Sequence, residues 1–256
     1  MCRILSYLGP SRSADELLRS PPNSLEVQSY QPKEMTEALL NADGFGFAWY
    51  TPARPEPARY RSVLPIWSDD NLKSMAPHIR SRCLLANVRS ATPGLAVHRA
   101  NTQPFIRGNL AFVHNGLLGS FRQALMRPLR KTLSDASYAA LEGNTDSEHI
   151  FALIADVNAA SLAERVRCGM YAVSTIVEGL GERALLNVSV TDGVSIVSVR
   201  YAIRDDPPSL YLVEETPWGE GSLVCSEPMF QQDIHHPLRP GELVIQTAEG
   251  VVRESL

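Results

Sequence analysis

The sequence has few cysteines, and no two of them lie close together. Its four cysteines form no CxxC spacing: Cys2, Cys83, Cys168 and Cys225. This argues against a disulfide framework or a zinc site and favours reduced thiols in a cytoplasm. The single close histidine pair, His235-His236, has no cysteine or carboxylate of metal-ligand spacing beside it. We therefore expect neither a metal nor a cofactor.

Long apolar runs are also missing. No stretch could span a bilayer, and the apolar residues after Met1 reach Gly9-Pro10 without a signal-peptide cleavage site. The net charge is -4 and the 24 Lys and Arg residues are scattered, so no basic field is available for nucleic acid or anionic lipid. The sequence predicts a cytoplasmic protein with no membrane or nucleic-acid partner.

The chain shows no linker and no low-complexity tract, so its 256 residues predict one domain over residues 2–256. Apolar periodicity predicts strands in the first half and two long helices over residues 145–157 and 161–178. Antiparallel strands follow, with a hairpin at Asp192-Gly193. This order indicates an α+β architecture with stacked sheets and helices outside them.

Three segments are expected to be irregular or broken. Residues 11–33 are rich in Ser, Pro and polar side chains and are expected to be irregular, with one short helix around residues 15–19. Residues 52–57 predict a proline-rich loop, and Pro128 is expected to interrupt a helix over residues 123–131.

The first three residues, Met1-Cys2-Arg3, offer a nucleophile. Methionine aminopeptidases remove Met before a small side chain, which would leave Cys2 with a free α-amino group beside its thiol. A free thiol has a pKa of about 8.5 and an α-amine one of about 7.7–8.0, so near neutral pH the amine can take the thiol proton. The alternative is that Cys2 is only a small residue opening a β-favourable strand over residues 2–8.

Two later strands end in polar residues. Arg89 follows a buried-strand pattern and precedes a Pro-Gly loop, where it could bind a carboxylate or be a surface cation. Asn115-Gly116 follows the strand over residues 109–114 and usually indicates a tight turn. The functional alternative is that the Asn115 amide and the Gly116 N–H point at a developing oxyanion.

The helix over residues 145–157 begins with Thr145-Asp146-Ser147-Glu148, which has the form of a capping box. Asp146 in its first turn is favoured by the helix dipole. That is a sufficient structural reason for this carboxylate, although the same position could hold a substrate ammonium.

Phe45, Phe47 and Trp49 alternate with small residues in the segment 43–50. This pattern predicts a strand whose glycine side lies against another backbone or a ligand. A glycine-rich core strand explains it equally well.

Taken together, these motifs resemble those of the class II glutamine amidotransferases, which are N-terminal-nucleophile hydrolases. Four motifs follow one another in the order and rough spacing of that family: Cys2, Arg89-Ser90-Ala91-Thr92, His114-Asn115-Gly116 and Thr145-Asp146-Ser147-Glu148. The resemblance includes Asp43-Gly44-Phe45-Gly46 with Trp49-Tyr50, and Asn101 with Pro104-Phe105. It covers most of residues 2–155.

The resemblance implies a four-layer αββα sandwich of two stacked, largely antiparallel sheets. It also implies that Cys2 is the nucleophile and that its α-amine is the general base and acid. The amide of Asn115 and the N–H of Gly116 would form the oxyanion hole.

The substrate residues are implied in the same way. Arg89, helped by Thr92, would bind the α-carboxylate of a γ-glutamyl group, and Asp146 its α-ammonium. A zwitterion needs both charges met in a fixed geometry, so this pair selects glutamyl over other acyl groups.

Within the family the chain most resembles the ergothioneine-pathway branch, the γ-glutamyl-hercynylcysteine S-oxide hydrolases. The trimethylammonium group of that substrate prefers an aromatic surface, and we expect Trp49, Tyr50 and Tyr30 to line the pocket. The sequence departs from the family at Asn87 and Gln103, where many members have histidine. Because these two residues belong to the expected pocket wall, the sequence does not fix the identity of the leaving group.

The expected activity is that of a free-standing hydrolase on a small γ-glutamyl substrate, because no synthase domain follows the motifs. Three alternatives stay open. The chain could cleave glutathione-like peptides, it could be a glutaminase subunit that feeds a separate synthase partner, or it could be a catalytically silent binding protein. A homodimer is also compatible with the sequence.

Overall fold

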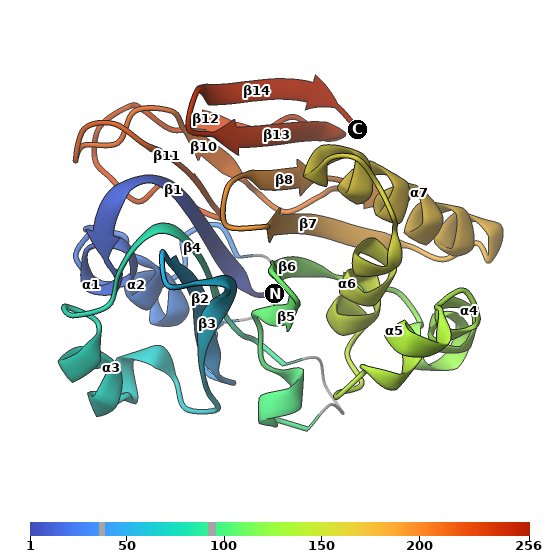
Figure 1. Cartoon of the computed structure of the whole chain (residues 1–256). Helices are drawn as coiled ribbons and strands as arrows, with labels where there is room; N and C mark the ends of the chain where they lie inside the picture. Colours follow the sequence, from blue (N-terminus) through green and yellow to red (C-terminus); the bar gives the residue numbers. More distant parts are fainter. Residues whose placement is uncertain (36–38, 92–95) are drawn as a thin grey trace.

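The computed structural model describes residues 1–35, 39–91 and 96–256. Within them two sheets lie face to face, and helices cover the outer face of each sheet (Figure 1). The protein is therefore a four-layer αββα sandwich, and the fold implied by the sequence resemblance is confirmed.

The first sheet is antiparallel and has the strand order β12-β10-β11-β1-β4-β2-β3. Its strands are β1 (Arg3–Ser13), β2 (Phe45–Thr51), β3 (Arg54–Ser62), β4 (Arg80–Val88), β10 (Tyr211–Val213), β11 (Ser222–Cys225) and β12 (His236–Pro237). The N-terminal strand β1 thus lies in the interior of the sheet, between β4 and β11.

The second sheet is also antiparallel and has the order β14-β13-β8-β7-β6-β5, with β9 paired to β7. Its strands are β5 (Phe105–Arg107), β6 (Leu110–Leu118), β7 (Ala184–Thr191), β8 (Ile196–Arg200), β9 (Ala202–Ile203), β13 (Glu242–Thr247) and β14 (Gly250–Ser255).

The helices divide between the two outer layers. The first sheet is covered by α1 (Ala14–Leu18), α2 (Leu25–Tyr30) and α3 (Asp70–Met75), and the second by α4 (Met126–Lys131), α5 (Asp135–Ala139), α6 (Asp146–Asp156) and α7 (Leu162–Gly179). Short 3-10 turns, η1 (Ile66–Ser68) and η2 (Arg99–Asn101), and a π turn, η3 (Phe121–Leu125), complete the set. In the described part of the chain, no helix is both long and apolar enough to cross a bilayer.

Strand alternation builds three apolar layers. In β1, Leu5 and Tyr7 pack under the helices of the first sheet, while Ile4 and Leu8 face the second sheet. Residues that share the parity of Ile4 therefore point into the space between the sheets, and this includes the position of Cys2.

Three local predictions are wrong. Residues 11–13 continue β1, and the segment predicted to be irregular holds a second helix, α2, besides the short helix expected around residues 15–19, which is α1. The prolines of residues 52–57 lie mainly in β3, which tolerates them because it is the edge strand of its sheet. Pro128 does not end the helix, since it is the third residue of α4 and α4 continues directly from the π turn η3.

Candidate active site

Cys2 lies directly before β1 and is partly exposed. Its thiol contacts the carbonyl oxygen of Ser90 at 3.9 Å. The next residues fix the strand: Arg3 is opposite Val88 in β4, and the N–H of Ile4 donates to the hydroxyl of Ser226 at 2.9 Å. The predicted nucleophile therefore sits beside the predicted Arg89 loop, although 88 residues separate Cys2 from Ser90.

Arg89 is a buried cation at the end of β4, with 4% of its surface exposed. Its Nη1 donates to the carbonyl of Asp43 at 3.4 Å, and it forms no ion pair within the described residues. A buried guanidinium without a counter-ion is costly, and a ligand carboxylate would supply one. The alternative that Arg89 is a surface cation is wrong.

Asp43 holds the Arg89 loop in place, and sequence reasoning did not assign it this task. Its backbone N–H donates to the carbonyl of Arg89 at 3.0 Å, and its carboxylate accepts from the N–H of Ala91 at 2.8 Å. The N–H of Arg89 in turn donates to Gly44 at 2.8 Å. Thr92, predicted to assist Arg89, lies outside the described residues.

Asn115 lies within β6, in register with Asn187 of β7, and not in a tight turn. It shares the parity of Ala111 and Val113, which pack between the two sheets. Asn115 is fully buried, and neither polar atom of its side chain has a hydrogen-bond partner among the described residues. An unpaired buried amide is what an oxyanion hole requires before substrate arrives.

Gly116 has a steric reason to be glycine. A Cβ added there would lie 1.8 Å from the carbonyl oxygen of Leu185 and 2.6 Å from Nε2 of His114. The turn interpretation of Asn115-Gly116 is therefore wrong, because glycine here admits the backbone of β7 instead of forming a bend.

Asp146 is the first residue of α6, and its carboxylate reaches the end of β6. One oxygen accepts from the N–H of Leu118 at 2.9 Å and the other from the N–H of Ser147 at 2.8 Å. Thr145 caps the helix through the N–H of Glu148 at 3.2 Å. The capping box is only half formed, since the Glu148 carboxylate accepts instead from the N–H groups of Glu142 and Gly143.

His114 connects these parts through a buried network that sequence reasoning missed. Its Nε2 contacts the carbonyl of Leu185 at 2.9 Å, so Nε2 carries the proton, and Nδ1 accepts from the Ser147 hydroxyl at 2.9 Å. Burial lowers the pKa of His114, which keeps the ring neutral. Ser147 also contacts Asp146 at 3.3 Å, so the ring links β6 to the carboxylate.

Gln103 and Asn87, the two departures from the family pattern, both serve the same strand. The Gln103 carboxamide accepts from the N–H of His114 at 2.5 Å and donates to its carbonyl at 3.0 Å. Asn87 donates to that carbonyl at 3.5 Å. Both side chains therefore support the strand that carries Asn115.

Trp49 and Tyr50 do not share a face of β2, so the prediction that both line one pocket is wrong. As neighbours in β2 they point to opposite faces, with Trp49 in the layer under the helices and Tyr50 between the sheets. The Tyr50 hydroxyl donates to the carbonyls of Asn109 and Thr191. The end of β2 that lies beside the Arg89 loop is the other one, where Phe45 is opposite Val88. Tyr30 packs edge-on against Trp67.

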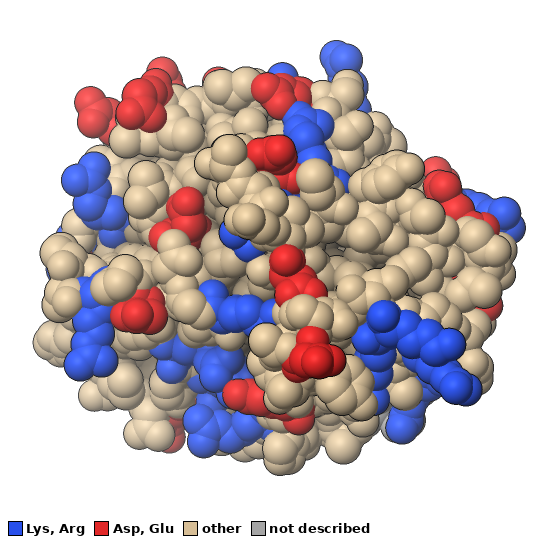
Figure 2. Space-filling view, turned by 45° about the vertical axis from the view of Figure 1, so that its right-hand side comes forward, with Lys and Arg blue, Asp and Glu red and all other residues tan. Residues whose placement is uncertain are grey.

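The face of the molecule drawn in Figure 2 carries no dominant charge. Acidic and basic side chains are interspersed over the face shown in Figure 2. In the described residues, no group of three or more His, Cys, Asp or Glu side chains could hold a metal ion.

Comparison with known sequences gives a family for the whole arrangement. The profile of the class-II glutamine amidotransferases matches residues 22–229. A gamma-glutamyl-hercynylcysteine sulfoxide hydrolase of Mycolicibacterium smegmatis is 35% identical over 227 residues, which are 84% of this chain and 95% of that protein. The hydrolase of the same name from Mycobacterium tuberculosis is 42% identical over 118 residues, 46% of this chain; the match spans only half of that protein's length.

A solved structure agrees along the full length. The class-II glutamine aminotransferase domain protein of Silicibacter pomeroyi has a TM-score of 0.75 and 27% identity, and the match covers 99% of both chains. The family profile matches well over half of the chain and the Mycolicibacterium smegmatis relative aligns along nearly its whole length, so the chain belongs to the class-II glutamine amidotransferase family.

Proposed function

We propose that the protein is a γ-glutamyl amide hydrolase that acts on γ-glutamyl-hercynylcysteine S-oxide, with Cys2 as nucleophile after removal of Met1. Two relatives carry this activity in their names. The observation that carries the proposal is the contact between the Cys2 thiol and the Ser90 carbonyl at 3.9 Å, because it holds the nucleophile one residue from the buried cation Arg89.

Removal of Met1 is essential to this mechanism. While Met1 is attached, the nitrogen of Cys2 is part of a peptide bond and cannot act as a base. Once free, the α-amine takes the thiol proton as sulfur attacks the γ-carbonyl carbon. The negative charge that develops on the carbonyl oxygen is met by the amide of Asn115 and the N–H of Gly116.

The proton held by the α-amine then passes to the leaving nitrogen. The C–N bond breaks, the amine product departs, and a γ-glutamyl thioester stays on Cys2. Water attacks this thioester with the amine again as base, and the thiol and free glutamate are released.

Selection of the glutamyl group rests on two opposite charges. Arg89 supplies a forked cation for the α-carboxylate, and Asp146 supplies a carboxylate for the α-ammonium. Asp146 is held by two backbone N–H groups, so its position is set before the substrate binds. The proposed enzyme is one domain over residues 2–256, and its proton transfers use the amine of Cys2 and no cofactor.

The test is glutamate release from γ-glutamyl-hercynylcysteine S-oxide, glutathione and glutamine in parallel, with the intact mass measured for every sample. We expect rapid release from the sulfoxide by protein that lacks Met1, and loss of release in Cys2→Ala, which is trimmed in the same way. Faster release of glutamate from glutathione would show that glutathione, and not the sulfoxide, is the preferred substrate. No release from any of the three by trimmed protein would refute the hydrolase and favour a subunit that needs a synthase partner.

A further inference from the structure

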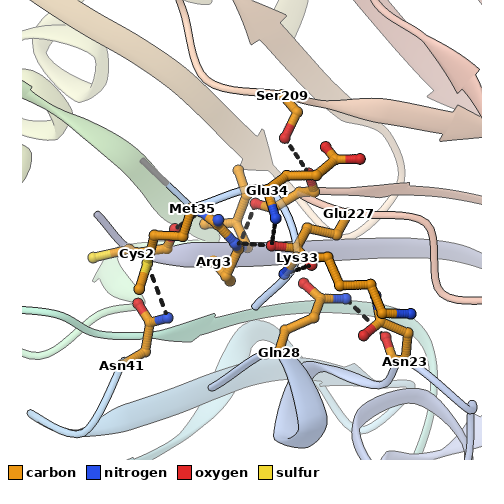
Figure 3. A network of polar contacts seen from close by, with 12 residues as sticks. Cys2, Arg3, Asn23, Gln28, Lys33, Glu34, Met35, Asn41, Ser209 and Glu227 are labelled. Atoms are coloured by element: carbon orange, nitrogen blue, oxygen red, sulfur yellow. Dashed lines mark hydrogen bonds and ion pairs between the residues drawn. The ribbon is translucent and has the colours of Figure 1, made fainter. Parts of the chain in front are cut away.

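A buried ion pair lies directly behind the proposed nucleophile. Nε of Arg3 is 2.8 Å from Oε1 of Glu227, and the two side chains are 1% and 0% exposed. Nη1 of Arg3 donates to the carbonyl oxygen of Cys2 at 3.0 Å. Figure 3 shows this guanidinium between the Glu227 carboxylate and Cys2. One planar group thus joins a fixed anion to the backbone of the first residue of the proposed enzyme.

Glu227 also holds the chain that follows α2. Its Oε2 accepts from the N–H of Lys33 at 2.9 Å, and its Oε1 from the N–H of Glu34 at 3.0 Å. The same chain later reaches Asp43, whose carboxylate binds the N–H of Ala91 beyond Arg89. Glu227 therefore binds both the first residue of β1, next to Cys2, and the backbone of the two residues at 33 and 34.

Cys2 has little else to orient it. Strand β1 begins at Arg3, so Cys2 lies outside the ladder. Its hydrogen bonds within the described residues are the one from Arg3 to its carbonyl and the 3.9 Å contact of its thiol with Ser90. A chain terminus frays unless it is tied down, and Cys2 becomes the terminus once Met1 is removed.

We propose that Arg3 and Glu227 are positioning residues which, by fixing the carbonyl of Cys2, aim its amine and thiol at the substrate. This rests on the proposed function of Cys2. The pair lies outside the proposed glutamyl contacts, Arg89 and Asp146, so it acts on the chemical step and not on substrate binding. Lysine at position 3 cannot replace arginine, because an ammonium lacks the planar fork that reaches the carboxylate and the carbonyl together.

The test compares Arg3→Lys, Glu227→Gln and the double variant R3Q/E227Q with wild type, after intact mass confirms that Met1 is absent from each. Single variants leave a buried group without its partner and can fail to fold, whereas the neutral double variant removes both charges together. We expect the double variant to keep the wild-type melting temperature within about 5 °C. Its kcat for glutamate release should fall at least tenfold, with KM changed less than twofold.

A second readout needs no substrate. Iodoacetamide alkylation of Cys2 is followed by peptide mass, with the exposed Cys168 of the same molecule as reference. In the double variant the thiol should leave Ser90, and the ratio of the Cys2 rate to the Cys168 rate should rise at least threefold. The remote pair Arg253 and Glu242, 2.6 Å apart on the second sheet, provides the matched control R253Q/E242Q, which should leave the ratio unchanged.

A folded double variant with wild-type kcat and a wild-type alkylation ratio would overturn the proposal and leave the pair a structural one. If trimmed wild type releases no glutamate from any substrate, the proposed function fails, and the alkylation ratio alone then decides whether Arg3 and Glu227 position Cys2.

Discussion

Replacing Asn115 by leucine should make the protein more stable and less active at once. The Asn115 carboxamide is fully buried, and neither of its polar atoms has a partner in the described residues. Each unpaired buried group costs about 1–3 kcal/mol of desolvation. Leucine removes both groups, and the extra volume costs about 1–3 kcal/mol in packing. We therefore expect the free energy of unfolding in urea to rise by about 1–3 kcal/mol.

The same change removes a proposed oxyanion donor. Loss of one such donor lowers kcat by about 10²–10³, because the hydrogen bond is strongest in the transition state. KM should change little, since Arg89 and Asp146 are untouched. Glutamate release measured at several substrate concentrations separates the two constants.

Asn187 is the matched control, because it lies opposite Asn115 in the ladder and is equally buried. Its Nδ2 donates to the carbonyls of Pro208 and Ser209 at 2.9 and 3.2 Å. Its Oδ1 has no partner among the described residues, but leucine at this position would also leave the carbonyls of Pro208 and Ser209 without their donor. Asn187→Leu should therefore lower the free energy of unfolding by about 1–3 kcal/mol. If Asn115→Leu destabilised the protein as much as Asn187→Leu, its amide would have a partner in solution. An unchanged kcat in folded Asn115→Leu would remove it from the oxyanion hole.

Three further predictions concern geometry, charge and pH. Gly116→Ala should lower the free energy of unfolding by more than about 3 kcal/mol because its Cβ meets backbone, whereas Gly179→Ala, with open space at a helix end, should raise it by about 0.5–1 kcal/mol; denaturant titration compares them. Arg89→Lys should raise KM at least tenfold while the protein keeps its melting temperature, because lysine cannot form the forked contact with the α-carboxylate; an unchanged KM would place the carboxylate elsewhere. Burial lowers the pKa of His114 and of His149, so below their ordinary value of 6.5 the unfolded chain binds more protons than the folded one. The contribution of these two neutral histidines to the free energy of unfolding should accordingly be fully present above about pH 7 and be lost as the pH drops toward 5. Urea titrations across this range should show a shallower decline of that free energy for His149→Gln.

The elements that could be predicted from sequence are those in which apolar residues repeat with the period of a helix or of a strand over many residues, or in which a turn dipeptide separates two strands. The helix predicted over residues 161–178 is α7, Leu162–Gly179, and the hairpin at Asp192-Gly193 joins β7 to β8. The glycine side of β2 is predicted to lie against another backbone or a ligand, and the structure shows a backbone there, since a Cβ on Gly46 would lie 2.3 Å from the carbonyl of Gln103. In each case local chemistry and tertiary packing favour the same conformation.

The partners of the candidate site could not be predicted, because they join segments that are distant in sequence. Nothing near Glu227 indicates that it binds Arg3, 224 residues away. Gln103 was noted only as a departure, yet its amide substitutes for a strand partner of His114. The error over Trp49 and Tyr50 was avoidable, because consecutive residues of a strand point to opposite faces.

The place of β1 in its sheet has a consequence for the order of events during synthesis. The N–H of Ile4 finds its partner only in Ser226, 222 residues further along the chain. At about 5–20 residues per second, roughly 10–40 s pass before the ribosome has made that partner. The N-terminal strand therefore waits without its β11 neighbour for most of translation, and the proposed removal of Met1 by an aminopeptidase has this interval in which to occur.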